Sequence, residues 1–251
     1  MSGHSKWATI KHKKAAIDAK RGKIFSRMSK EITMAAKLGG GDPDMNPRLR
    51  SAVLAAKAVN MPSDNIERAI KKGTGELPGV SYEEIMYEAY GPAGVGLLIQ
   101  VLTDNRNRAA GEVRATLERK GGALAGSGAV SWQFSKKGLI TVDKTRASED
   151  DLLLLVSDAG AEDLKTTEDT FEIITPVEAF EAVKKALEDS KIPTRSAELA
   201  MVPASTVKIT NEKDAAAMLK LLEAIEDLDD VQNVYSNFDM DEELMQRVSA
   251  G

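Results

Sequence analysis

The chain has 251 residues, of which 42% are hydrophobic and 29% are charged, as in ordinary soluble globular proteins. It contains no cysteine, which excludes disulfide bonds, thiolate catalysis and sulfur-ligated metal sites. The longest apolar run, residues 152–156, is far shorter than the roughly 20 residues that a membrane span needs. We therefore expect a cytoplasmic protein that does not span a membrane.

Charge is distributed unevenly along the chain. Residues 1–75, called the head here, carry 16 lysines and arginines against 6 acidic residues, a net charge of +10. Residues 76–251, the body, carry 18 against 33, a net charge of −15. A basic head on an acidic body predicts a polyanion as the partner of the head. Nucleic acids and membrane surfaces are both polyanions, so the charge alone does not choose between them.

The head is predicted to be a basic arm followed by three helices. The helices are expected over residues 20–38, 48–60 and 66–72. On a helical wheel the first has apolar residues on one side and lysines and arginines on the other, which is typical of an amphipathic helix. Ser63 or Asp64 is expected to cap the third. Together these elements predict a first domain over residues 1–79. Packing against the two following helices would use the apolar side of the first and leave only its cationic side for a partner, so we expect no membrane partner.

After residue 79 the hydrophobic pattern becomes typical of strands. Strands are expected over residues 85–90, 95–102 and 129–134, with a helix that Thr103 or Asp104 caps and that runs to Arg119. The order β-β-α-β leaves this sheet incomplete, and a β-α-β block over residues 206–238 also lacks a partner. We therefore predict one discontinuous domain, built from residues 80–135 and 205–240.

A complete unit lies between these two blocks. Residues 136–204 have the order β-α-β-β-α-β, which is that of ferredoxin-like domains. Capping boxes are expected at Ser148 with Asp151 and at Thr175 with Glu178. The sequence thus predicts an α+β fold, with a small helical N-terminal domain followed by two α/β sheet domains of ferredoxin-like type, one inserted in the other. Residues 241–251 are expected to fray or to form a short helix.

Side chains suited to catalysis are few. The two histidines, His4 and His12, lie in the basic arm with no acid placed to orient them, so a Ser-His-Asp triad has little support. Acidic clusters at residues 223–230 and 239–243 have the ligands for Mg²⁺, but a solvated acidic face is the simpler interpretation. The glycines match neither the dinucleotide fingerprint nor the P-loop. We expect a non-enzymatic protein with no metal, no cofactor and no small-molecule substrate.

Nucleic-acid binding has the strongest support from the sequence. The candidate contacts are the cations of the arm and the first helix with one indole and one imidazole: Lys6, Trp7, Lys11, His12, Lys13, Lys14, Lys20, Arg21, Lys23, Arg27 and Lys30. Trp7 has two interpretations, a stacking platform for bases or an apolar plug that packs the arm onto the core. The cations also have a simpler interpretation, as a solvated helix face.

The segment from Thr103 to Arg108 is a second candidate for phosphate binding. Its predicted strand-to-helix junction offers free N–H groups, and Arg106 and Arg108 supply positive charge. The structural alternative is that Asp104 caps the helix and that Arg108 pairs with Glu112, four residues later. The sequence leaves both interpretations open.

Motifs along the whole chain are similar to those of the YebC/PmpR family. They include Gly3-His4-Ser5-Lys6-Trp7, Asn60-Met61-Pro62, Glu88-Ala89-Tyr90-Gly91-Pro92, Thr103-Asp104-Asn105-Arg106-Asn107-Arg108 and Val234-Tyr235-Ser236-Asn237-Phe238. The chain departs from the family pattern within residues 122–130, where alanines replace the expected Asn, Gly and Ser. This departure weakens the expectation of polar contacts from that loop.

The resemblance implies a cytoplasmic, non-enzymatic α/β protein of three domains. Some members have been labelled DNA-binding transcriptional regulators, and others look like ribosome-associated factors that help translation through proline-rich stretches; the family includes the mitochondrial translational activator of cytochrome oxidase. We therefore expect a DNA-binding regulator, with a translation factor that binds ribosomal RNA on the ribosome as the alternative. The lack of a base-reading helix-turn-helix leans toward RNA, and the lack of dimer heptads fits a monomer.

Overall fold

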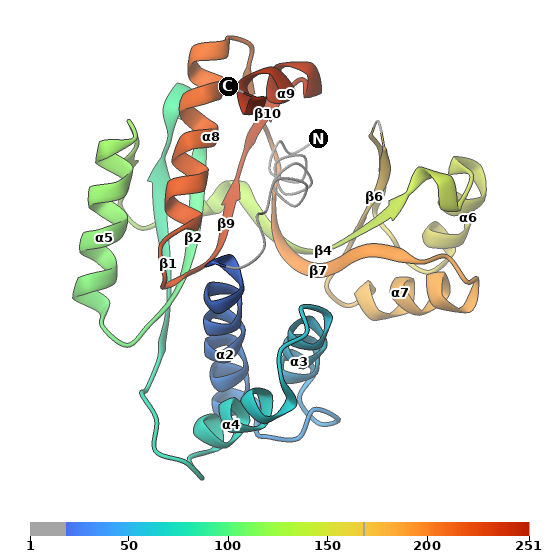
Figure 1. The fold of residues 1–251 in the computed structure, drawn as a ribbon. Helices are drawn as coiled ribbons and strands as arrows, with labels where there is room; N and C mark the ends of the chain where they lie inside the picture. The colour runs from blue at the N-terminus through green and yellow to red at the C-terminus, as the bar shows by residue number, and fades with distance from the viewer. Residues whose placement is uncertain (1–18, 168, 251) are drawn as a thin grey trace.

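The computed structural model describes residues 19–167 and 169–250. Within the described residues three helices come first, and two four-stranded antiparallel sheets with their own helices follow (Figure 1). In Figure 1 the three helices lie below one sheet, and the other sheet extends to the right. The predicted α+β fold class, helical first and then two sheet units, is confirmed.

The head contains the helices α2 (Ala19–Gly39), α3 (Pro47–Ala58) and α4 (Ser63–Thr74). Their apolar sides form one core that includes Ile32, Leu49 and Ile66. Gly73 lets α4 approach α2 closely, because a Cβ atom at this position would lie 2.4 Å from the carbonyl oxygen of Thr33. The amphipathic pattern of α2 is therefore used as predicted, with its apolar side in the core.

Asn46 joins the end of α2 to the start of α3. Its Oδ1 accepts the backbone N–H of Leu49, and its Nδ2 donates to the carbonyl oxygens of Ala35 and Gly40, both at 2.8 Å. Helix α4, in contrast, begins at Ser63 after Pro62 with no side-chain cap, so the predicted cap at Ser63 or Asp64 is wrong. The fixed φ of a proline suits a helix start without such a cap.

The first sheet, called the middle sheet here, has the strand order β3-β1-β2-β9. Its strands are β1 (Glu83–Tyr90), β2 (Gly96–Thr103), β3 (Ala123–Leu124) and β9 (Val231–Ser236), with a 3-10 turn η1 (Pro92–Gly94) between β1 and β2. Helices α5 (Arg106–Arg119) and α8 (Glu212–Glu226) pack on one face. β2 lies in the centre and is almost wholly buried, as its continuous apolar run predicted.

The second sheet has the order β5-β6-β4-β7, which is the ferredoxin-like arrangement predicted for this segment. Its elements are β4 (Phe134–Asp143), α6 (Glu149–Asp158), β5 (Asp163–Thr166), β6 (Thr170–Thr175), α7 (Phe180–Asp189) and β7 (Thr194–Pro203), with a 3-10 turn η3 (Lys144–Arg146) after β4. The chain then returns, and β9 pairs with β2 of the middle sheet. A strand that follows the second sheet in the chain thus completes the middle sheet, as a discontinuous middle domain requires. The bounds of the domains stay a prediction.

The last segment adds a small parallel pair and a helix. Strands β8 (Val207–Ile209) and β10 (Phe238–Met240) pair in parallel, and α9 (Glu242–Ala250) follows. Leu244 and Met245 of α9 are buried in the core beside α8. The predicted single strand over residues 231–238 is thus divided at Asn237, whose Oδ1 accepts the backbone N–H of Gly96.

Two further local predictions are wrong. The expected strand over residues 129–134 is a loop with a 3-10 turn, η2 (Ser131–Gln133), because its N–H groups donate to the carboxylate of Glu88 and not to a strand. The capping box at Thr175 does not form, since the Thr175 hydroxyl donates to the Pro176 carbonyl and α7 begins only at Phe180. The capping box at Ser148 with Asp151 is confirmed.

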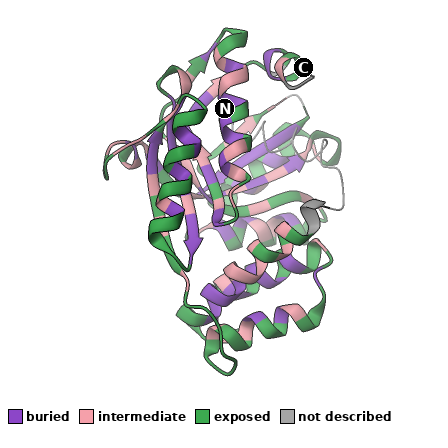
Figure 2. Cartoon of the chain, turned by 60° about the vertical axis from the view of Figure 1, so that its left-hand side comes forward, coloured by how far each residue is buried: buried purple, intermediate pink, exposed green. Residues whose placement is uncertain are grey.

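The middle sheet is covered on both faces. Helices α5 and α8 cover one face, and on the other Leu98 packs with Val130, Phe134 and Met201. Figure 2 shows the buried residues concentrated on the strands and on the inward sides of the helices. The cluster around Leu98 links the middle sheet to β4 and β7 of the second sheet, because Phe134 lies on β4 and Met201 on β7.

Candidate nucleic-acid interface

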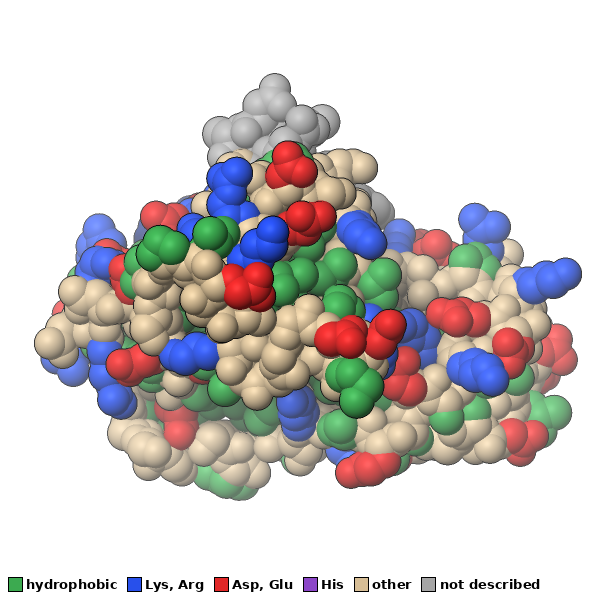
Figure 3. Space-filling view, turned by 90° about the horizontal axis from the view of Figure 1, so that it is seen from below, with side chains coloured by type: hydrophobic (Ala, Val, Ile, Leu, Met, Phe, Trp, Pro, Cys, Tyr) green, Lys and Arg blue, Asp and Glu red, His purple; other side chains and the backbone are tan. Residues whose placement is uncertain are grey.

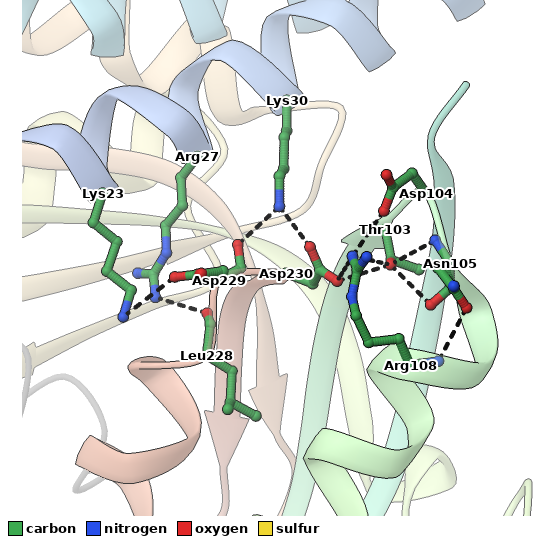
Figure 4. A network of polar contacts seen from close by, with 10 residues as sticks. All are labelled: Lys23, Arg27, Lys30, Thr103, Asp104, Asn105, Arg108, Leu228, Asp229 and Asp230. Carbon is green, nitrogen blue, oxygen red and sulfur yellow. Dashed lines mark hydrogen bonds and ion pairs between the residues drawn. The ribbon is translucent and has the colours of Figure 1, made fainter. Parts of the chain in front are cut away.

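The cationic side of α2 faces the end of α8 and the loop that follows it. Helix α8 has no basic residue in its own last turn. Lys23, Arg27 and Lys30, from a helix about two hundred residues earlier, lie against residues 226–230 instead (Figure 4). We call these three cations and residues 226–230 the clamp. It joins the head to the middle sheet.

Two cations of the clamp donate to carbonyl oxygens at the end of α8, and the third donates to a carbonyl in the loop that follows. Lys23 donates to the carbonyl of Asp227, and Arg27 donates to that of Glu226. Lys30 Nζ lies 2.9 Å from the carbonyl oxygen of Asp229. The last carbonyls of a helix lack partners within the helix and carry a partial negative charge, so cations stabilise them. The clamp therefore caps α8 from outside.

Asp230 is the buried centre of the clamp, with 5% of its surface exposed. Its Oδ1 lies 2.6 Å from Lys30 Nζ, and its Oδ2 accepts hydrogen bonds of 2.8 Å from the Thr103 hydroxyl and from Arg108. Burial raises the pKa of Asp230, but these hydrogen bonds outweigh burial and bring the pKa below its ordinary value. The carboxylate is therefore ionised at neutral pH, and it binds elements of the head and of the middle sheet together.

The segment from Thr103 to Arg108 is bound into the same network. Asn105 caps α5 by accepting the backbone N–H of Arg108, so the predicted caps Thr103 and Asp104 are wrong. Arg108 donates to Asp104 at 2.7 Å and to Asp230 at 2.8 Å, where Glu112 was the expected partner. The structural alternative for this segment thus has direct support, with different partners from those expected. Arg106, the first residue of α5, is exposed.

Most of the predicted arm contacts lie outside the described residues: Lys6, Trp7, Lys11, His12, Lys13 and Lys14. Lys20 and Arg21 lie at the start of α2, and their side chains are also outside the described part. The structure therefore brings together Lys23, Arg27, Lys30 and Arg108, all within or beside the clamp. Nucleic-acid binding by the residues of the predicted set stays a prediction.

The sequence reasoning missed a group of exposed cations on α3 and α4. They are Arg50, Lys57, Arg68, Lys71 and Lys72. The last three have the spacing i, i+3 and i+4, which places them on one side of α4 and was visible in the sequence. In Figure 3, which views the molecule from the side of the head, basic and acidic side chains are interspersed. The described part of this face is therefore not one continuous basic patch.

The described residues form neither a metal site nor a membrane-spanning helix. Within residues 19–167 and 169–250, no group of three or more His, Cys, Asp or Glu side chains is placed to hold a metal ion. Among the described helices, none is long and apolar enough to cross a membrane.

Comparison with known proteins identifies the family. Residues 5–76 match the family model described as the TACO1/YebC protein N-terminal domain, and residues 82–238 match that of the TACO1/YebC second and third domain. The chain belongs to the TACO1/YebC family. Its YebC-like resemblance, inferred from the motifs, is thereby confirmed.

Relatives within the TACO1/YebC family are similar over their whole length. A protein of Geobacter sulfurreducens is 56% identical over 248 residues, 99% of this chain and 100% of the relative. One of Syntrophobacter fumaroxidans is 55% identical over 249 residues, with the same coverage of 99% and 100%. Both are named probable transcriptional regulatory proteins. The crystal structure of a conserved hypothetical protein from Aquifex aeolicus superposes with a TM-score of 0.84 at 48% identity, covering 94% of this chain and 97% of that one.

Proposed function

We propose that this TACO1/YebC protein is a non-enzymatic, cytoplasmic regulator of gene expression that binds nucleic acid through its head, acting on DNA as a transcriptional regulator. The observation that carries the proposal is the separation of charge, +10 in the head against −15 in the body. Lysines and arginines that neutralise phosphates supply most of the affinity of such proteins. The names of the relatives, as probable transcriptional regulatory proteins, support the same function.

The proposal divides the predicted cations between two tasks. Lys23, Arg27 and Lys30 have acceptors inside the molecule, so we assign them to the clamp, which holds the head against the body. Arg108 bonds to Asp230 of the clamp, so we assign it a structural role as well. The nucleic-acid contacts are assigned to the arm and the cations next to it: Lys6, Trp7, Lys11, His12, Lys13, Lys14, Lys20 and Arg21, with Arg106 on α5. We add the exposed cations of α3 and α4 as supporting phosphate contacts.

The alternative is a ribosome-associated factor that binds ribosomal RNA and relieves stalling at proline-rich stretches. One observation favours it. The exposed side of α4 carries Asp64 and Glu67 beside its cations. Carboxylates on a helix laid in the major groove would face the phosphates, which disfavours base reading by this helix. Backbone recognition of a folded RNA has no such requirement for a groove-reading helix.

Binding experiments separate these functions. Fluorescence anisotropy of the full chain is measured with labelled promoter duplexes, random duplexes and a ribosomal RNA fragment at several salt concentrations. A DNA-binding regulator should prefer some promoter over random DNA, typically by about 10³-fold or more. Equal affinity for all duplexes, together with co-sedimentation with ribosomes, would support the RNA alternative. If no nucleic acid binds even at low salt, the proposed function is wrong.

A further inference from the structure

The loop between β3 and β4, residues 125–133, is built around a buried carboxylate. Glu88 of β1 has 7% of its surface exposed, and it accepts the backbone N–H groups of Gly128 and Val130 at 2.7 Å and of Ser131 at 2.9 Å. Burial raises the pKa of Glu88, but these three bonds outweigh burial and lower the pKa. An ionised carboxylate thus fixes the loop conformation. We call residues 125–133 the aromatic loop, for the side chain that it presents.

An apolar contact of Val130 and two hydrogen bonds of Gln133 also hold the aromatic loop in place. Val130 is fully buried against Leu98 and Phe134. The carbonyl of Gln133 accepts the N–H of Ala204 at 2.7 Å, and its side-chain oxygen accepts from Asn237 at 2.9 Å. The aromatic loop is therefore fastened to the middle sheet and to the strand that leaves the second sheet.

The aromatic loop presents Trp132 to solvent, and Tyr90, the last residue of β1, is exposed next to it and bonds to the same loop. Trp132 is 75% exposed and Tyr90 is 41% exposed. The indole N–H of Trp132 and the hydroxyl of Tyr90 both donate to the carbonyl oxygen of Ala129, each at 3.1 Å. Since their polar groups are already bonded within the molecule, what the two rings offer a partner is their flat π-faces. A single exposed apolar residue needs no explanation, but two exposed rings on one acceptor form a preorganised surface.

The chain around these rings is basic, in contrast to the rest of the body. From residue 117 to residue 137 it carries Arg119, Lys120, Lys136 and Lys137 against one acid, Glu118. Lys120 and Lys136 are exposed, whereas Lys137 is paired with Glu162 at 2.7 Å. Tyr90 pairs with Ala123 in the sheet, so the backbone three residues after Lys120 lies next to that of Tyr90. Exposed aromatic rings beside cations are the combination that single-stranded nucleic acids bind.

We propose that Tyr90 and Trp132 form a stacking site for unpaired bases of a single-stranded nucleic acid, with Lys120 and Lys136 contacting its phosphates. The inference rests on the proposed function, because it takes the partner to be a nucleic acid, and adds a second contact surface on the body. A proline-rich peptide also packs on aromatic rings, but it carries no negative charge for the adjacent lysines to neutralise. The charge of the two lysines therefore favours a single-stranded nucleic acid over a proline-rich peptide.

The two tryptophans of the chain, Trp7 and Trp132, make a direct test possible. In the full-length Trp7→Phe variant all indole emission comes from Trp132, and it is titrated with oligo(dT) and oligo(U). Stacking quenches this emission. Trp132→Ala in the same background should weaken oligonucleotide binding, measured by anisotropy, by roughly 5- to 100-fold. Trp132→Phe should restore part of the affinity. The slope of affinity against salt should stay unchanged, because a stacked ring releases no counterions.

A matched control is Leu154→Ala, which removes another exposed apolar side chain, 67% exposed, from α6. It should leave oligonucleotide affinity unchanged. Unquenched Trp132 emission and unaltered affinity of Trp132→Ala, with oligonucleotide still bound, would overturn the stacking site and leave the proposed function intact. Quenching by a proline-rich peptide and not by oligonucleotides would overturn it also. If neither duplex nor single strand binds the full chain, the proposed function itself fails.

Discussion

Lys30 Nζ lies 2.6 Å from Asp230 Oδ1, although 200 positions separate the two residues in the chain. Their side chains are only 14% and 7% exposed. A buried ion pair has a high desolvation cost, which is offset only when geometry is good and other hydrogen bonds satisfy the remaining atoms. Thr103 and Arg108 supply those bonds to Asp230. This pair therefore helps to hold the head on the middle sheet, together with the bonds of Lys23 and Arg27.

Removing the charge at this position should be costly. Asp230→Asn leaves Lys30 and Arg108 beside a neutral amide, and we expect the free energy of unfolding to fall by about 3 kcal/mol. Urea denaturation followed by circular dichroism measures the change. The matched control is Asp229→Asn, one residue earlier, whose side chain is 86% exposed and lies 3.7 Å from Lys23. It should cost about 1 kcal/mol or less. Equal losses for the two variants would contradict a special role for Asp230.

The clamp should also make stability depend on pH in the acid range. Because the pKa of Asp230 is lowered in the folded protein, its contribution is complete above the ordinary aspartate pKa of about 4. It is lost as the pH falls from there through the lower pKa of the folded state. Unfolding free energies measured from pH 7 to pH 3 should decline less steeply for Asp230→Asn than for the natural protein. Parallel declines would show that Asp230 is not linked to the acid transition.

Glu88 should control the order of the aromatic loop. Glu88→Gln replaces a carboxylate that accepts three backbone N–H groups with an amide that has one acceptor oxygen. We expect a loss of about 3 kcal/mol, since hydrogen bonds to charged groups contribute more than neutral ones. In a Trp7→Phe background, the emission and near-ultraviolet circular dichroism of Trp132 should change as well. Glu118→Gln, an exposed residue on α5, provides the control and should alter neither signal.

Two glycine-to-alanine substitutions should have opposite effects. A Cβ at Gly73 would lie 2.4 Å from the carbonyl oxygen of Thr33 and 2.7 Å from the Cβ of Ala36, so Gly73→Ala must push α4 away from α2. We expect a loss of about 2 kcal/mol or more from overpacking. Gly111 of α5 has open space around such an atom, and Gly111→Ala should stabilise by about 0.5–1 kcal/mol. Thermal unfolding compares them, and a Gly73→Ala variant as stable as the natural protein would refute the close packing of α4 on α2.

The sequence pattern correctly predicted those strands and helix caps that depend on residues close together in the chain. The apolar run at residues 95–102 became the central strand β2, and Ser148 caps α6 as its sequence indicated. The helical wheel also found the cationic side of α2. It did not show what that side contacts, because the acceptors lie at the far end of the chain and include backbone carbonyls, which sequence patterns do not reveal.

The aromatic loop was missed for a similar reason. Its alternating apolar residues are typical of a strand, and only the buried Glu88, 40 residues before Gly128, diverts the backbone N–H groups from strand pairing. Trp132 then becomes an exposed side chain, whereas a strand would have given no reason to single it out. The predicted arm contacts, which lie before the described residues, depend on charge alone and stay a prediction.

We assign the cations of the arm to nucleic-acid binding and those of the clamp to holding the head on the body. The most direct test is the salt dependence of duplex affinity in two full-length variants, Lys13→Glu/Lys14→Glu in the arm and Lys23→Gln/Lys30→Gln in the clamp. Lys208→Glu/Lys213→Glu, exposed cations of the body, controls for net charge.

The arm variant should weaken binding and lower the magnitude of the slope of log K against log salt by about 2, one unit for each lost phosphate contact, at unchanged stability. The clamp variant should lose stability and keep the slope. A slope lowered by the clamp variant and untouched by the arm variant would contradict the account.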